Sequence, residues 1–225
     1  MTTGQAMTIP TRLFDPALPV KIIDRRLPHW SQAGAITFIT WRTADSIPAD
    51  VLRTWLAQRD AFLREHQIDP RLPTWRLAIE RLNPKAWTVF HREHSSRWHD
   101  HLDACHGECP LRDPRASRIV ADVLHHFDGQ RYELIDFVTM PNHVHVQAAF
   151  PDEQSMLAQC DSWKHFTARE INRLLRRKGR FWQQDGYDHL VRSEDEWRAL
   201  RQYIGQNPVL ANLKPSEYIH YAKAM

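Results

Sequence analysis

The sequence predicts an α+β protein built on a ferredoxin-like, split βαβ antiparallel sheet. β-branched and aromatic residues gather in four segments of strand length, at 35–41, 132–138, 143–150 and 187–191. Helical periodicity separates the first strand from the second and the third from the fourth. One further helix follows the last strand. This order places the helices on one face of the sheet and adds a C-terminal helix to the fold.

Composition narrows the class of protein further. The chain has 225 residues, of which 42% are hydrophobic and 25% charged, and these are ordinary values for a globular domain. Three cysteines, an odd number, argue against a disulfide framework. No apolar run approaches ~18 residues, so no membrane partner is expected. We expect a soluble, cytoplasmic protein whose pI near 8.9 makes the local clustering of cations informative.

The domain organisation follows from the order of the expected helices and strands along the chain. We expect one domain over 1–225, with its core at about 32–45 and 117–213 and a polar, proline-punctuated arm at 1–31. A helical insertion of about 46–116 follows the first strand. Three helices are expected in and near it, at 49–64, 75–82 and 84–102.

The core helices carry recognisable start signals. Asp113-Pro114 predicts the start of a helix that runs to Phe127, and helical periodicity extends from 155 to 177. Ser193 precedes three acidic residues, a pattern typical of a capping box. The helix that it opens is expected over 197–206, ended by Asn207-Pro208.

The stretch Met140-Pro141-Asn142-His143-Val144-His145 carries the first chemical signal. Successive side chains of a strand alternate between faces, so His143 and His145 share one face. Two neighbouring imidazoles are able to bind one metal ion. Taken alone, the pair is equally consistent with two histidines on a solvated sheet face.

The second signal lies in the last core helix. Tyr203 and Asn207 are four residues apart and therefore share a helix face. A tyrosine hydroxyl serves as a covalent nucleophile in some enzymes, and an amide oxygen is a ligand for hard divalent ions. Without the histidines, a structural tyrosine and a helix-ending asparagine would be the simpler interpretation.

Together the two motifs resemble a known family. His143-Val144-His145 is similar to the HUH motif of one-tyrosine, IS200-like transposases. Tyr203-x-x-x-Asn207-Pro208-Val209 resembles the tyrosine motif of the REP-associated tyrosine transposases within that group. The resemblance covers about 32–45 and 117–213, whereas the insertion is longer than the family minimum.

The resemblance implies a metal-dependent endonuclease and transposase acting on single-stranded, hairpin-flanked DNA as a monomer or homodimer. Tyr203 would be the nucleophile and form a 5′-phosphotyrosine, while His143, His145 and Asn207 would hold Mg²⁺ or Mn²⁺. The alternative is a catalytically silent, domesticated regulator that binds DNA or RNA on the same fold. An intact set of these four residues favours the enzyme.

A basic segment follows the helix at 155–177. The residues expected to contact DNA are Lys164, Arg173, Arg176, Arg177, Lys178, Arg180 and Trp182. A solvated helix end that complements the helix dipole is the alternative. Five cations within eight residues, followed by Phe181 and Trp182, favour a phosphate-binding patch with stacking aromatic rings.

Two other groups of residues compete for a functional interpretation. The stretch 91–109 holds several histidines with Cys105 and Cys109, a composition that suggests zinc, but no second pair has zinc-finger spacing. We interpret it as a solvated insertion. Among the other tyrosines, Tyr187 has no ligand-like residue four positions later, and Tyr132 lies in an expected core strand.

Overall fold

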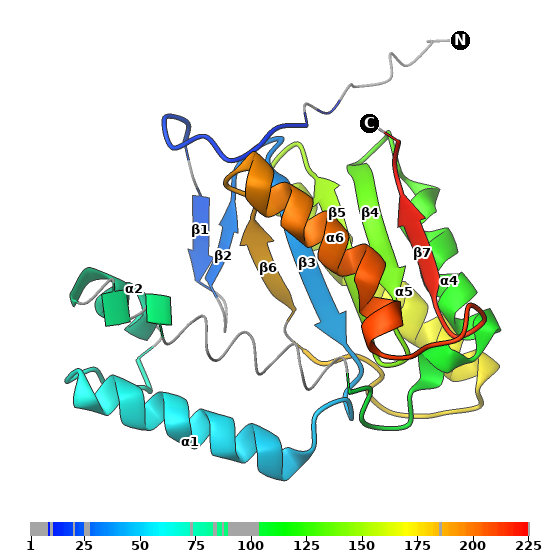
Figure 1. Ribbon diagram of the computed structural model, residues 1–225, viewed down its shortest axis with the longest axis horizontal. Coiled ribbons are helices and arrows are strands. Elements are labelled where there is room, and N and C mark those ends of the chain that lie inside the picture. The colour runs from blue at the N-terminus through cyan, green and yellow to red at the C-terminus, as the bar shows by residue number, and fades with distance from the viewer. Residues whose placement is uncertain are drawn as a thin grey trace. The chain divides into compact units, whose positions relative to one another are not determined.

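The protein is described by a computed structural model (Figure 1). The structure describes residues 9, 11–19, 21–24, 28–72, 74–82, 85–86, 88–89, 104–184 and 186–224. These form two compact units, one of residues 1–44 with 109–225 and the other of residues 45–108. The first unit contains the expected core. Its second segment begins at residue 109.

The core unit is organised around a five-stranded sheet of order β6-β3-β5-β4-β7. Its strands are β3 (Ile36–Arg42), β4 (Glu133–Thr139), β5 (His143–Ala149), β6 (Tyr187–Leu190) and β7 (Ile219–Ala222). All neighbouring strands are antiparallel. The first four strands have the order of the split βαβ fold, which confirms the predicted fold class.

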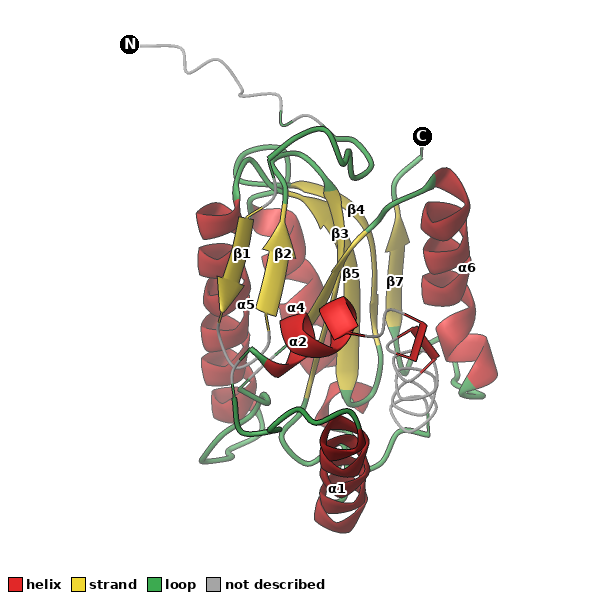
Figure 2. Cartoon of the chain, turned by 90° about the vertical axis from the view of Figure 1, so that its left-hand side faces the viewer, coloured by secondary structure: helices red, strands yellow, loops and turns green. Residues whose placement is uncertain are grey.

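The helices of this unit cover both faces of the sheet (Figure 2). Helices α4 (Pro114–His126) and α5 (Glu153–Leu174) pack against one face, and α6 (Glu194–Leu210) lies against the other. The connecting helices therefore occupy one face, as the sequence predicts. Among the described helices of this unit, α6 alone lies on the opposite face.

Alternation along the central strands explains why the α4 and α5 face is apolar. Val144, Val146 and Ala148 of β5 belong to one buried cluster with Ile39 and Trp41 of β3. The same cluster includes the inward residues of both helices, among them Val120, Leu124, Met156, Trp163 and Ile171. This layer is the hydrophobic core of the unit.

Side-chain caps begin each core helix, and those at Asp113 and Ser193 lie where the sequence indicates, whereas α5 begins at Glu153 rather than at the expected 155. Asp113 accepts a hydrogen bond from the Arg115 amide ahead of α4, with Pro114 in its first turn. Asp152 accepts from the Ser155 amide ahead of α5. Ser193 accepts from the Glu196 amide at 3.1 Å, so α6 starts at Glu194 rather than at the expected Trp197.

The end of α6 differs from the expectation in an informative way. The helix continues to Leu210 with Pro208 inside it, instead of ending before Asn207. Pro208 has no N–H to donate to the preceding turn. The last turn is nonetheless closed, because the Ala211 amide donates to Asn207 O and the Leu213 amide to Pro208 O. Asn207 is therefore a helical residue, and the helix sets its direction relative to Tyr203.

Two strand regions were not predicted. Strands β1 (Lys21–Asp24) and β2 (Pro28–Ser31) pair within the segment expected to be an extended arm. Strand β7 pairs with β4 where a tail was expected. Both regions are four-residue strands, too short to give a clear periodicity.

The second unit contains α1 (Ala49–Glu65) and α2 (Trp75–Leu82), two of the three helices expected there. Leu63, Ile68, Trp75 and Ile79 form its own buried cluster. The third expected helix, at 84–102, falls largely outside the described residues, as do the four histidines at 91–101. Within the described part of the chain, no helix combines the length and apolarity that a membrane span requires.

Candidate active site

The histidine motif lies on the face of β5 that α6 covers. His143, His145 and Gln147 alternate with the core residues of the strand and are all fully buried. The rings of the two histidines are 4.6 Å apart between centroids. The strand therefore brings the two imidazoles together, as the sequence predicts.

Neighbouring side chains orient both imidazoles. His143 Nδ1 lies 2.7 Å from Asn142 Oδ1, an acceptor, so Nδ1 donates and Nε2 carries the lone pair. His145 Nδ1 lies 2.7 Å from Thr40 Oγ1, and the ring stacks on Phe38 at 5.2 Å. Fixing Nδ1 in this way is how proteins direct the Nε2 of a histidine toward a ligand.

Tyr203 reaches the histidines from α6. Its hydroxyl lies 3.3 Å from His145 Nε2, and the two rings are 5.2 Å apart with their planes at 62°. The edge of the Tyr203 ring also approaches Phe38. The structure therefore brings together a tyrosine and a histidine that are 58 residues apart in the sequence.

Asn207 lies one helical turn after Tyr203 and is fully buried. Because α6 does not end before Pro208, Asn207 keeps the helical geometry that places it on the same side of the helix as Tyr203. The four residues singled out by the motifs thus come from β5 and from the α6 helix that covers its polar face.

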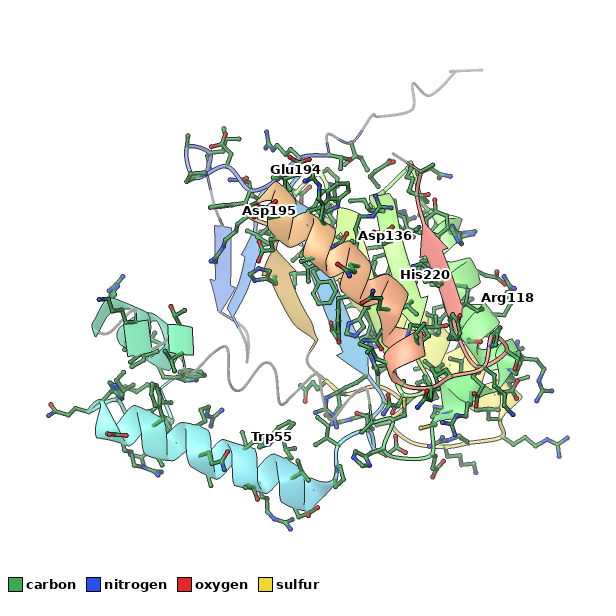
Figure 3. All side chains as sticks on the ribbon, in the orientation of Figure 1. Trp55, Arg118, Asp136, Glu194, Asp195 and His220 are labelled. Atoms are coloured by element: carbon green, nitrogen blue, oxygen red, sulfur yellow. The ribbon has the colours of Figure 1, made fainter. Side chains whose placement is uncertain are left out.

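Polar contacts along the sheet hold α6 against this face. Arg201 Nε lies 2.7 Å from Asp136 Oδ2 without the angle of a hydrogen bond, while Nη2 donates to Asp136 Oδ1 at 3.2 Å. Arg201 also donates to the Lys223 carbonyl beyond β7. Burial raises the pKa of Asp136, and Arg201 opposes that rise. Asp136 and His220 lie along α6 in Figure 3.

The start of α6 is tied to the opposite edge of the sheet. Glu196 accepts from His189 Nε2 of β6 at 2.7 Å, and its second oxygen accepts from the Arg192 amide at 2.6 Å. Since Asp136 belongs to β4, α6 crosses the sheet and is held on both sides of His145. These contacts position the hydroxyl of Tyr203.

The basic segment lies beyond the end of α5, which stops at Leu174 rather than at Arg177. Arg173, Arg176, Lys178 and Arg180 are exposed. Backbone hydrogen bonds from Ala44 to Phe181 and from Gln183 to Arg42 attach the end of the segment to β3. Arg42 pairs with His143 across the strands, so the cations lie at the histidine end of the sheet.

Two residues expected to contact DNA have other roles. Trp182 is buried against Trp41, and its indole N–H donates to Thr167 Oγ1 at 2.9 Å. A ring in this position packs in the core and offers no face to a base, which corrects the expectation of stacking. Lys164 donates to the Gln184 carbonyl at 2.9 Å, and its side chain is only 18% exposed.

The other tyrosines differ from Tyr203 in their surroundings. Burial raises the pKa of Tyr132 to about 12, and its hydroxyl donates to the Leu124 carbonyl. Tyr221 stacks on Phe137, on the opposite face of the sheet. Tyr187 pairs with Thr40 through its backbone, and its side chain is outside the described part of the structure.

Sequence reasoning missed the residues that support the histidines. Thr40 and Asn142 orient the imidazoles, and Arg42, only 7% exposed, lies opposite His143 on β3. Burial lowers the pKa of Arg42 to about 10. The alternation of Thr40 and Arg42 with Ile39 and Trp41 was a visible signal, but the pairing register with β5 was needed to interpret it.

The donor set suits a hard or borderline divalent cation. Two oriented imidazole nitrogens and one amide oxygen are acceptable ligands for Mn²⁺ or Mg²⁺. Among the described residues, no group of three or more His, Cys, Asp or Glu side chains is placed to hold a metal ion. A cation held by His143 and His145 would therefore depend on the amide of Asn207.

Comparison with known proteins bears on the identity of this domain. Residues 112–207 match the family described as "Transposase IS200 like". No curated protein sequence matches the chain. One solved structure, of a REP-associated tyrosine transposase bound to a REP hairpin, matches with 13% identity over 85% of this chain and 89% of that chain, at a TM-score of 0.37. The family match contains all four motif residues, and it confirms for residues 112–207 the resemblance to IS200-like transposases that these motifs indicated.

Proposed function

We propose that this protein nicks and rejoins single-stranded DNA through a covalent bond to Tyr203. The observation that carries the proposal is the 3.3 Å approach of the Tyr203 hydroxyl to Nε2 of His145. It brings a nucleophile from one motif to the oriented imidazole of the other. The IS200-like family match over this segment supports a transposase rather than an unrelated use of the fold.

The proposed reaction is an in-line displacement at phosphorus. The Tyr203 oxygen forms a bond to the phosphorus atom, and the bond from phosphorus to the 3′ oxygen breaks. The phenolic proton passes to solvent, and the departing 3′ oxygen takes up a proton. The 5′-phosphate end created by the cut stays attached to Tyr203 until the 3′-hydroxyl of a second strand attacks it and reverses the step. No phosphodiester bond is lost overall, so no ATP is required.

The chain's own residues supply the orientation that this step needs. The phenol has an ordinary pKa of about 10, so it reacts only where its oxygen is held close to the phosphate and its ionised form is stabilised. Arg201 and Glu196 hold α6 on the sheet, and this sets the position of Tyr203. Thr40 and Asn142 hold the imidazoles.

We propose that His143, His145 and Asn207 would hold Mg²⁺ or Mn²⁺. When bound, the cation would supply Lewis-acid polarisation of the scissile phosphate. The Tyr203 hydrogen bond and cation binding use the same Nε2 lone pair of His145, so they are alternatives. Tyr203 therefore exchanges its contact with His145 for one with the phosphate when the enzyme acts.

The exposed cations beyond α5 are proposed to guide the DNA strand to the histidine end of the sheet. Phosphate contacts provide most of the affinity for nucleic acid and little of the sequence specificity. Arg176, Lys178 and Arg180 contribute these contacts together with Arg173 in the last turn of α5 and the partly exposed Arg177, whereas Trp182 does not because it is buried. Arg42, beside His143, adds a cation within the site itself.

The experiment is to incubate the protein with hairpin-flanked single strands and Mn²⁺ and to determine its mass. In the wild type we expect a mass increase equal to the fragment on the 3′ side of the cut, which is attached through its 5′-phosphate, and we expect none in Tyr203→Phe. Tyr187→Phe is the matched control and retains the adduct. An adduct that persists in Tyr203→Phe would assign the nucleophile elsewhere. Binding without any adduct in the wild type would support the silent regulator instead.

A further inference from the structure

We propose that Gln147 is a further catalytic residue, whose side-chain amide donates hydrogen bonds to the scissile phosphate of the DNA strand. The proposal rests on the proposed function and deepens it by adding a residue outside the two motifs. Gln147 follows His145 by two positions on the same face of β5. No pattern in the sequence singles it out.

The amide of Gln147 has no internal partner in the part of the chain that the structure describes. Its side chain is fully buried, and neither its nitrogen nor its oxygen makes a hydrogen bond. Buried polar groups are almost always hydrogen-bonded, because leaving one unpaired opposes folding. A leucine or methionine of similar size would fill the same space without that cost.

The neighbours of Gln147 in the sheet make no hydrogen bond with its amide. Its cross-strand neighbour on β3 is Phe38, whose ring offers no hydrogen-bonding group. Its neighbour on β4 is Asp136, whose carboxylate is paired with Arg201. The amide is therefore held between an aromatic ring and the ion pair of Asp136 with Arg201, and it makes no hydrogen bond with Asp136 Oδ2, which itself accepts none.

The same surroundings connect Gln147 to the site through Phe38. Phe38 contacts both His145 and Tyr203, so Gln147 borders the part of the face at which Tyr203 points. Bond formation requires the phosphorus to approach the Tyr203 oxygen closely. The non-bridging oxygens of the phosphate then come to this part of the face.

The chemistry of the amide fits these oxygens. A glutamine carries two N–H donors and no charge, so it binds an anion without needing a counter-ion when DNA is absent. Donors aimed at oxygens that gain negative charge in the transition state typically contribute 10²–10³-fold in rate. Such a residue opposes folding in the free protein and lowers the barrier in the complex.

The proposal predicts opposite effects of one substitution on two properties. Gln147→Met removes an unpaired buried amide while keeping the volume, so the melting temperature of the full chain should rise by about 2–4 °C. The rate of adduct formation on Tyr203 should fall by at least about tenfold. The Kd for the DNA strand should change less than about threefold, because the other phosphate contacts remain.

The test measures melting temperature, DNA affinity and adduct rate for Gln147→Met, Gln147→Leu and Gln147→Glu. Gln159→Met is the matched control, a buried glutamine of α5 in the opposite layer, and should leave the adduct rate unchanged. Gln147→Glu should lose at least as much rate as Gln147→Met, because a carboxylate repels the phosphate. The second apolar variant, Gln147→Leu, keeps the test open if Gln147→Met does not fold.

Wild-type adduct rates in both apolar variants overturn the proposal and leave the role of Tyr203 intact. A Gln147→Glu variant that matches the wild type also overturns it, because the position would then serve a cation. A wild type that forms no adduct refutes the proposed function itself. In that case an unchanged or lowered melting temperature in both apolar variants shows independently that Gln147 has a structural role.

Discussion

Replacing Arg201 by methionine tests how α6 is held over the histidines. In the native protein its guanidinium contacts Asp136 at 2.7 Å and donates to the Lys223 carbonyl at 2.9 Å. The carboxylate of Asp136 is 1% exposed, and the Arg201 side chain is 25% exposed. Methionine keeps the aliphatic packing of the arginine stem and removes its charge, so Asp136 loses its cation.

The size of the effect follows from this burial. Breaking a fully buried ion pair typically costs about 3–5 kcal/mol, since one charge is left uncompensated. Arg201 is partly solvated, so we expect a loss of about 2–3 kcal/mol in the free energy of unfolding at pH 7. For a chain of this length the corresponding fall in melting temperature is about 4–12 °C.

The loss should depend on pH with a definite sign. Burial raises the pKa of Asp136 above its ordinary 3.8 in the folded protein, and removing Arg201 raises it further. A carboxyl with a raised folded-state pKa binds protons more tightly when folded, so stability falls as pH rises from the unfolded-state pKa through the folded-state pKa. The destabilisation by Arg201→Met should therefore be largest at neutral pH and shrink on acidification toward the ordinary value.

The assay is thermal unfolding followed by circular dichroism between pH 4 and pH 8, with the double variant Asp136→Asn/Arg201→Met as the control. Because asparagine carries no charge, the double variant should recover much of the stability and lose the pH dependence. If the double variant is as unstable as Arg201→Met alone at pH 7, the uncompensated charge is not the cause. The contact would then act through packing.

Three further predictions address the metal, the DNA path and the helix. His143→Ala and His145→Ala should each abolish cleavage while leaving DNA affinity largely intact. Cleavage assays and gel-shift assays would measure the two properties. Cleavage by the double variant would contradict the metal assignment. Neutralising the three cations Arg176, Arg177 and Lys178 together should weaken binding to all DNA sequences. It should also reduce the slope of log affinity against log salt concentration by about one unit per lost phosphate contact. An unchanged slope would mean that the DNA binds elsewhere. Gly205→Ala should stabilise the protein by about 0.5–1 kcal/mol in denaturant unfolding, because among the described residues the new methyl group would meet only His220, at an ordinary contact distance of 3.6 Å. A fall in stability would mean that α6 needs a glycine there.

Local sequence alone determined most elements of the core fold and the chemistry of the motifs. The cap at Ser193 and the proline after Asp113 mark helix starts, because those residue types satisfy or tolerate free backbone amides. The alternation of His143 and His145 with valines assigned one polar and one apolar face to β5. Such signals depend only on residues close together in the sequence, so they can be interpreted without knowing which other elements pack against them.

Other features required the tertiary structure, because they depend on which strands pair and in which register. Only the pairing of β3 with β5 shows that Thr40 orients His145 and that Arg42 lies opposite His143. The burial of Trp182, which removed it from the DNA-binding set, depends on contacts with β3 and α5.

The C-terminal helix gives the clearest contrast between the two. The sequence supplied the four-residue spacing of Tyr203 and Asn207. The rule that proline disrupts a helix predicted an end before Pro208. In the structure the helix continues to Leu210, with backbone hydrogen bonds from Ala211 and Leu213 closing its last turn. The ion pair of Arg201 with Asp136 links positions 65 residues apart, and no periodicity encodes it. Side-chain types and their spacing can be read from the local sequence, whereas long-range packing across the sheet determines where the tyrosine lies relative to its histidine.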